Sequence, residues 1–150
     1  MKHVSDVPAA RLLVIEDNPA DVMLLELALK KQGLLFELIH LLDGGEALAF
    51  VRRLVTHHQA AIPDLVLVDL NLNKYTGEEI VREIRATKYL VNVPVCVWSS
   101  SRSESDKSRL RCLGVVRFIT KPTGLDQFME IGKIIKDLLA NCSTGLTAMA

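Results

Sequence analysis

Short apolar runs recur along this chain, separated by longer stretches in which apolar residues return at helical spacing. The central run is Leu65-Val66-Leu67-Val68, which lies between Asp64 and Asp69. A run this short and this apolar fits a strand that is buried on both faces, as in the middle of a parallel sheet. Similar runs predict further strands at 12–15, 34–42, 93–98 and 115–119.

Between these runs, apolar residues spaced three or four apart predict helices. The first helix has clear ends, because Asn18 is a good N-cap, Pro19 suits the first helical position and Gly33 favours termination. The stretch at 102–111 is mostly polar, so we expect an exposed helix there. Further helices are predicted at 46–54, 77–87 and 125–140; the last carries an apolar stripe that would serve the core or a dimer.

The predicted elements form a strand–helix unit that is repeated five times. Alternation of this kind predicts a parallel sheet with helices on both faces and right-handed crossovers. We therefore expect an α/β fold of the flavodoxin-like (βα)5 type, a three-layer sandwich with the strand order 2-1-3-4-5. One domain at 11–140 accounts for the pattern, with a loose leader at 1–10 and a frayed tail at 141–150.

Charge and cysteine content narrow the class of protein. Eighteen basic and eighteen acidic residues cancel, which argues against a surface devoted to nucleic acid. The three cysteines form no CxxC pair and no ligand spacing with His40, His57 or His58, so we expect neither a disulfide framework nor a zinc site. The sequence has no apolar signal core and no membrane-spanning run, and we expect a soluble, cytoplasmic protein without a membrane partner.

The candidate chemistry lies where the predicted strands end. In the expected order the first and third strands are neighbours, so their carboxyl ends bring Glu16, Asp17 and Asp69 into one crevice. Carboxylates gathered this closely need a cation, and oxygen ligands favour a hard ion such as Mg²⁺. The fourth strand ends on Ser99, and the fifth is followed by Lys121. A carboxylate nucleophile, a metal ion, a hydroxyl and an ammonium together suit phosphoryl transfer to aspartate.

The order and spacing of five separate elements resemble the receiver domain of two-component response regulators, over about 11–140. The resemblance implies that Asp69 accepts the phosphoryl group and that Lys121 and Ser99 bind it. It implies a signalling domain that assists only its own phosphorylation and dephosphorylation, not an enzyme. The five elements are Glu16-Asp17-Asn18, Asp69, Gly77, Ser99 and Lys121-Pro122, and the implied Mg²⁺ ligands are Glu16, Asp17, Asp69 and the backbone carbonyl of Asn71.

The resemblance also implies how phosphorylation changes the surface. Ser99 would move toward the phosphate, and Phe118 would turn inward and reshape the surface of the fourth helix, fifth strand and fifth helix. The bond between Lys121 and Pro122 would be cis, as is usual in the family. Four positions depart from the usual pattern: Ser99 replaces threonine, Asn73 replaces proline, Trp98 replaces a smaller aliphatic residue, and Phe118 lacks a hydroxyl.

More narrowly, the chain resembles the small phytochrome-associated response regulators, in the phrases at 16–21, 43–48, 69–72 and 125–128. Members of this type are single receivers without a DNA-binding or other output domain, and some form homodimers. The implied partners are a sensor histidine kinase or phosphotransfer protein and a downstream protein target.

Three other functions stay open at this point. A receiver-shaped binding module that is never phosphorylated is disfavoured by the complete acidic set and Lys121. A Mg²⁺-dependent hydrolase with an aspartyl-phosphate intermediate usually has a second aspartate two residues after the nucleophile, where this chain has Asn71, which cannot transfer a proton. A dinucleotide-binding enzyme is weaker still, because no GxGxxG follows the first strand.

Overall fold

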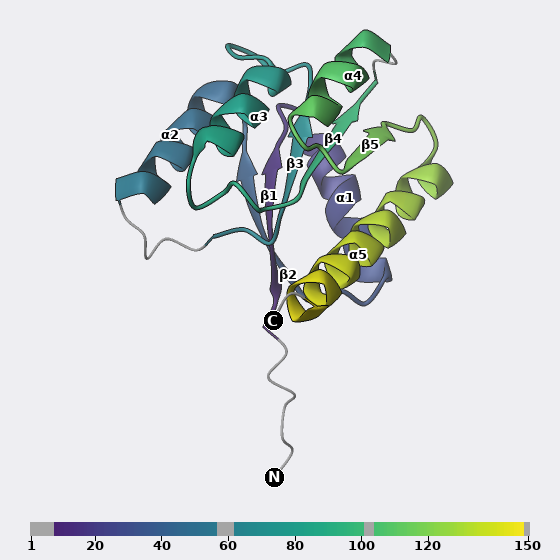
Figure 1. The fold of residues 1–150 in the computed structure, drawn as a ribbon. Coiled ribbons are helices and arrows are strands. Elements are labelled where there is room, and N and C mark those ends of the chain that lie inside the picture. Colours follow the sequence, from purple (N-terminus) through teal and green to yellow (C-terminus); the bar gives the residue numbers. More distant parts are fainter. Residues whose placement is uncertain (1–7, 57–61, 101–103, 149–150) are drawn as a thin grey trace.

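The computed structural model describes residues 8–56, 62–100 and 104–148, and the side chains of these residues up to 142. Within this part of the chain, the five strands run parallel in the order β2-β1-β3-β4-β5 (Figure 1). The predicted α/β fold and its strand order are therefore confirmed. The strands are β1 (Ala10–Ile15), β2 (Phe36–Leu41), β3 (Leu65–Asp69), β4 (Val95–Ser99) and β5 (Arg117–Thr120).

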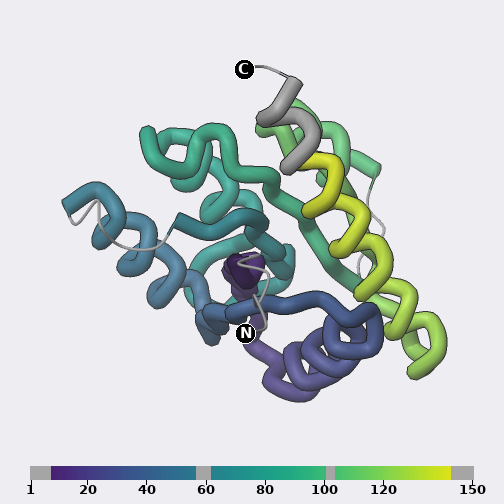
Figure 2. The backbone as a smooth tube through the Cα atoms, turned by 90° about the horizontal axis from the view of Figure 1, so that it is seen from below, coloured from purple at the N-terminus to yellow at the C-terminus, as the bar shows by residue number. Residues whose placement is uncertain are grey.

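Helices cover both faces of the sheet (Figures 1 and 2). One face carries α1 (Pro19–Lys31) and α5 (Leu125–Ala148), which pack side by side. Their close approach needs Gly132, because a Cβ there would collide with the backbone of Ala28. None of the described helices combines the length and apolar character that crossing a bilayer requires. The other face carries α2 (Gly44–Thr56), α3 (Gly77–Ala86) and α4 (Glu104–Cys112).

Several element ends differ from the predicted ones. β1 begins at Ala10, inside the predicted leader, and α2 begins at Gly44, because Asp43 Oδ1 accepts the N–H of Glu46 at 2.9 Å in its first turn. α5 continues to Ala148, so the end predicted near Ala140 is wrong, and the tail expected to be frayed is helical up to this point. Once a helix has formed, each added residue gains one backbone hydrogen bond and avoids the free-energy cost of nucleation, so α5 can extend even through weak helix formers. Outside the described residues lie 1–7 of the predicted leader, the loop at 57–61 with His57 and His58, and the predicted helix start at 102.

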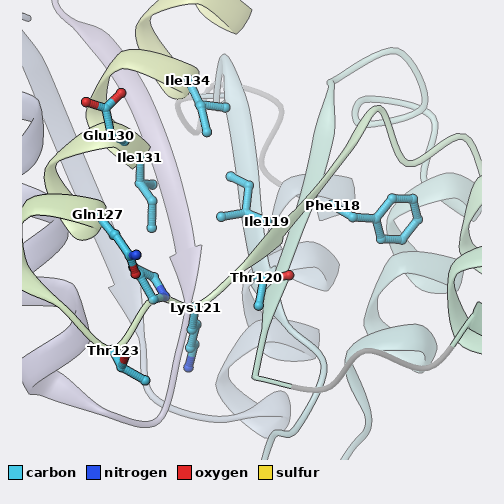
Figure 3. Close-up of a pocket in the computed structure, with 10 residues that line it drawn as sticks. Phe118, Ile119, Thr120, Lys121, Thr123, Gln127, Glu130, Ile131 and Ile134 are labelled. Carbon is cyan, nitrogen blue, oxygen red and sulfur yellow. The ribbon is translucent and has the colours of Figure 1, made fainter.

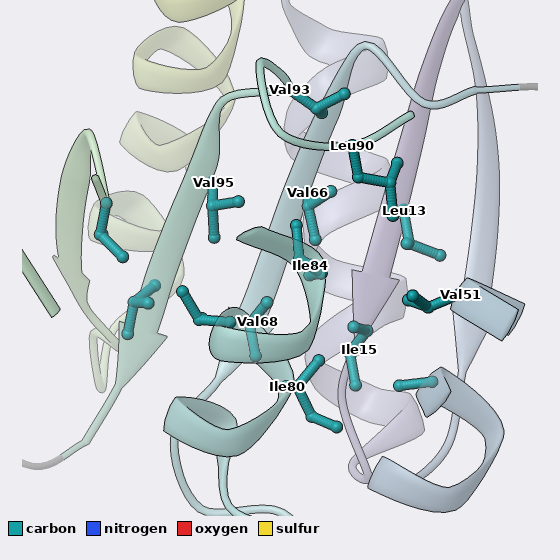
Figure 4. Close-up of a cluster of buried hydrophobic side chains, with 14 of the residues drawn as sticks. Leu13, Ile15, Val51, Val66, Val68, Ile80, Ile84, Leu90, Val93 and Val95 are labelled. Atoms are coloured by element: carbon teal, nitrogen blue, oxygen red, sulfur yellow. The ribbon is translucent and has the colours of Figure 1, made fainter. Parts of the chain in front are cut away.

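The core forms on both faces of the central strand. Every residue of β3 is buried, as its apolar run predicts. Val66 and Val68 point toward Ile84 of α3 (Figure 4), whereas Leu65 and Leu67 belong to the cluster under α1 and α5. The apolar stripe of α5 also packs into that second cluster, through Ile131, Ile134, Ile135 and Leu138.

Candidate functional site

The three predicted acidic residues lie together at the carboxyl edge of the sheet. β1 and β3 pair with Ile15 opposite Val68, so Glu16 and Asp17 follow β1 beside Asp69 at the end of β3. One carboxylate oxygen from each of these residues lies within 4.8 Å of the other two. Glu16 is 0% exposed and Asp69 is 4% exposed, so both carboxylates leave water on folding. The edge therefore concentrates negative charge in a nearly dry place.

Lys121, directly after β5, supplies positive charge to this cluster. Its Nζ lies 2.7 Å from Glu16 Oε2, 3.0 Å from Asp69 Oδ2 and 3.1 Å from Asp21 Oδ2. The same ammonium lies 5.0 Å from the centre of the Trp98 ring, within range of a cation–π contact. Burial alone would lower the pKa of Lys121, but the three adjacent carboxylates raise it above its usual value. The lysine is therefore a permanent cation.

The single ammonium does not offset the burial of the Glu16 carboxyl group. Burial raises the pKa of Glu16 to about 8, and the nearby charge of Asp69 adds to the rise. Lys121 and the backbone N–H of Asn18, which donates to Glu16 Oε1 at 3.1 Å, only partly oppose it. A divalent cation among these oxygens would stabilise the charged form of every carboxylate. The donor set contains oxygen atoms only, so the residues present fit a hard divalent ion.

The loop after Asp69 holds this carboxylate in place. The N–H of Asn71 donates to Asp69 Oδ1 at 3.0 Å, and the Asn71 side chain donates to Ser99 Oγ at 3.3 Å. Gly77 then returns the chain to the strand end, where its N–H donates to the carbonyl of Leu70 at 3.1 Å. A Cβ at Gly77 would collide with the backbone of Asp69, so only glycine permits this approach. Ser99, 3% exposed at the end of β4, is buried beside the loop.

Phe118 lies apart from the acidic cluster, on the surface between α4 and β5. Figure 3 shows its ring pointing away from Ile131 and Ile134, which line a pocket of about 360 Å³ between β5 and α5. The ring is half-buried, and the guanidinium carbon of Arg111 lies 5.5 Å from its centre. Lys121 also lines this pocket, and in the same view its side chain extends beyond the end of the strand.

Two residues at the site had no role in the sequence analysis. Asp21, in the first turn of α1, contacts Lys121, and His40 of β2 places Nε2 2.7 Å from the carbonyl oxygen of Glu16. Because a carbonyl only accepts, His40 Nε2 carries the hydrogen. The available signal for Asp21 was its place in the first turn of the predicted helix, because that helix begins directly after Glu16 and Asp17, at the same edge of the sheet. The cis bond predicted before Pro122 is wrong, because the described residues contain no cis peptide bond.

Comparison with known proteins agrees with this geometry. The response regulator receiver domain family matches residues 12–133. Response regulator Rcp1 of Synechocystis sp. is 34% identical over 124 residues, which span 83% of this chain and 84% of that protein. The crystal structure of the phosphorylated cyanobacterial phytochrome response regulator RcpA is similar, with a TM-score of 0.79 and 35% identity over 89% of this chain and 95% of that one. The Mn²⁺-bound form of Rcp1 gives a TM-score of 0.75 and 33% identity over 85% and 91%. The chain therefore belongs to the response regulator receiver domain family of two-component signalling.

Proposed function

We propose that this receiver accepts a phosphoryl group on Asp69 from the phosphohistidine of a sensor histidine kinase or phosphotransfer protein. The observation that carries the proposal is the position of Lys121 Nζ, 3.0 Å from Asp69 Oδ2 and beside the acidic cluster. Such a site combines a carboxylate nucleophile with a fixed positive charge for the transferring group. The similarity to RcpA, whose crystal structure is of the phosphorylated form, supports the same conclusion.

In the proposed step, a carboxylate oxygen of Asp69 attacks the phosphorus atom. The new O–P bond forms while the N–P bond of the phosphohistidine breaks, and the imidazole keeps the electron pair and takes up a proton. Lys121 stabilises the negative charge on the phosphoryl oxygens, and the hydroxyl of Ser99 donates to one of them. The N–H of Asn71, which donates to Asp69 Oδ1, orients the carboxylate before the attack.

The acidic cluster is the proposed Mg²⁺ site. When bound, Mg²⁺ supplies positive charge that neutralises oxygens of the phosphoryl group. The Mn²⁺-bound form of Rcp1 supports a divalent ion, and oxygen-only donors favour Mg²⁺ when a phosphate completes the coordination shell. The proposed ligands are the carboxylates of Glu16, Asp17 and Asp69 and the backbone carbonyl of Asn71.

We propose that phosphorylation is read at the surface of α4, β5 and α5. Ser99 moves toward the phosphoryl group, and Phe118 turns into the space that opens. This rotation would take the Phe118 ring from its contact with Arg111, 5.5 Å from the ring centre. A downstream protein would then bind the changed surface.

Its similarity to Rcp1 and RcpA supports the further proposal that the receiver acts in the cytoplasm without a DNA-binding or other output domain. A sensor histidine kinase, perceiving light or another signal, would supply the phosphoryl group. Pairing of two copies is a separate proposal, which sizing of the protein before and after phosphorylation tests.

The deciding experiment is transfer of radioactive phosphate from a labelled histidine kinase. We expect the protein to be labelled in Mg²⁺, whereas D69N and a sample with excess chelator stay unlabelled. D126N removes an exposed acidic residue from the first turn of α5 and should be labelled like the wild type. Label on D69N, or label under full chelation, would overturn the proposal.

Two outcomes would favour the alternatives instead. Unchanged spectra on addition of beryllofluoride and Mg²⁺ would favour a binding module that is not phosphorylated. Steady turnover of phosphate esters would favour the hydrolase, although Asn71 cannot transfer the proton that such chemistry requires.

A further inference from the structure

Three carboxylates already surround the ammonium of Lys121, which donates a hydrogen bond to Asp69 and forms ion pairs with Glu16 and Asp21. An ammonium carries three hydrogens and accepts nothing. Glu16, Asp69 and Asp21 each place a carboxylate oxygen between 2.7 and 3.1 Å from Nζ. A phosphoryl oxygen that arrives at Asp69 must therefore compete with these carboxylates for a place on Lys121.

Trp98 limits how the ammonium can rearrange. Its indole is fully buried and lies edge-on to Phe128, with ring centres 6.0 Å apart and planes at 73°. Its face lies 5.0 Å from Lys121 Nζ, so it excludes water on that side and holds the ammonium through its π-electrons. Since the lysine cannot simply turn toward water there, it must exchange one carboxylate partner for another anion.

The three carboxylates differ in how easily they can be released. The side chains of Glu16 and Asp69 are 0% and 5% exposed, whereas Asp21 is 21% exposed. Asp21 also lies outside the group of three residues whose oxygens could share a metal ion. It alone can return to water without leaving a buried charge unpaired, which is the expensive alternative.

From this we infer that Asp21 occupies the place of the phosphoryl group on Lys121 in the unphosphorylated protein, and that it competes with that group. The inference rests on the proposed function. It makes Asp21 a positioning residue that weakens binding of a phosphoryl group, because the contact between Asp21 and Lys121 must break first. The effect should resemble that of a partly exposed ion pair.

The test compares D21N with the wild type in binding of beryllofluoride at saturating Mg²⁺. The chain has one tryptophan, so the indole N–H of Trp98 gives a single signal in ¹⁵N–¹H spectra, next to Lys121. We expect D21N to bind the mimic about two- to fivefold more tightly, because a neutral amide is a weaker acceptor than a carboxylate. Structural damage would weaken binding instead, so the direction of the change separates the two causes.

D126N is the matched control, since it removes the same charge at the same edge of the sheet. Asp126 is exposed and forms none of the ion pairs of Lys121 found among the described residues. Its removal should act only through the long-range field, which salt screens. We therefore expect a smaller effect for D126N that disappears at high salt, and a tighter binding by D21N that persists there.

Unchanged or weaker binding by D21N would overturn the inference, and so would equal tightening by D126N. Melting followed by circular dichroism shows whether D21N is folded, and D21S serves in its place if it is not. If the wild type itself neither binds the mimic nor accepts phosphate, the proposed function fails, and this inference fails with it. If the wild type responds and only the D21N result is contrary, the proposed function stands.

Discussion

Two half-buried cations lie at opposite edges of the sheet and have opposite surroundings. Lys121, at the carboxyl edge, contacts three carboxylates. Arg85 of α3 lies at the amino edge, among the loops that precede β4 and β5, and forms no ion pair with any described carboxylate. Its guanidinium instead donates at 2.8–3.5 Å to the backbone carbonyls of Leu90, Val91, Val93, Leu113 and Gly114.

The difference separates a structural contact from a site for ligands. Burial lowers the pKa of Arg85, yet the carbonyl oxygens satisfy its donors and add no net charge. Around Lys121 the balance is reversed, because four acidic residues, Glu16, Asp17, Asp21 and Asp69, share this edge with one ammonium, and Glu16, Asp21 and Asp69 contact it. At the amino edge the donors of the cation are matched by neutral acceptors, whereas the carboxyl edge carries an excess of acidic groups that a further cation would offset.

The largest difference between the two edges should appear in phosphoryl transfer. We expect K121M to lower the rate of transfer to Asp69 about 100-fold or more, because it removes the fixed donor to the phosphoryl oxygens. R85M should transfer at the rate of the wild type at a temperature where both proteins are folded. Rapid-quench measurement with a labelled kinase gives both rates, and an equal loss in the two variants would contradict the division of roles.

The next effect concerns the free energy of unfolding, where Arg85 should matter more than any surface arginine. R85M leaves five carbonyls without their common donor, and we expect a loss of about 2–4 kcal/mol. R85K keeps the charge but not the planar array of donors, so it should recover only part of this. R82M, which breaks an exposed ion pair with Glu78 on the same helix, is the control and should lose under about 1 kcal/mol. Urea unfolding in Mg²⁺ measures all three, and a loss for R85M no larger than that for R82M would refute the role of Arg85.

A smaller effect should come from Mg²⁺ itself. At ten times its dissociation constant, Mg²⁺ should raise the free energy of unfolding of the wild type by about 1.4 kcal/mol. D17N removes a proposed ligand and should lose this gain, whereas R85M should keep it, because the two edges are too far apart to interact. Thermal melting with Mg²⁺ and with chelator tests the expectation, and a gain that survives in D17N would place the ion elsewhere.

How far the sequence predicts the contacts at each edge depends on whether they follow from the order of the strands or from details of the backbone. Glu16, Asp69, Ser99 and Lys121 were predicted together because the order of the elements fixes which strand ends share an edge. The carboxyl edge of a parallel sheet therefore follows from patterning alone.

The contacts that the sequence did not predict depend on the positions of backbone carbonyls and on the register of the strands, which the order of the elements does not fix. Arg85 resembles any arginine of an exposed helix turn, since its partners are backbone carbonyls and no residue type marks them. His40 depends on the register of β2 against β1, in which it lies opposite Val14. Register is set by the packing of whole strands, so the histidine resembled a surface residue until the strands were paired.

The smallest of these effects should come from His40. This residue lies at the carboxyl edge, but like Arg85 at the amino edge it donates to a neutral backbone carbonyl. His40 Nε2 donates to the carbonyl of Glu16 at 2.7 Å and so fixes the turn that carries Glu16 and Asp17. A single hydrogen bond of this kind contributes about 1 kcal/mol, so H40A should weaken Mg²⁺ binding about two- to fivefold. H40Q keeps an N–H donor and should restore much of the affinity. If the His40 ring acted only by packing, glutamine would not restore it. Mg²⁺ titrations followed by the Trp98 signal give the affinities; wild-type binding by H40A would show that the acidic turn holds its shape without the histidine.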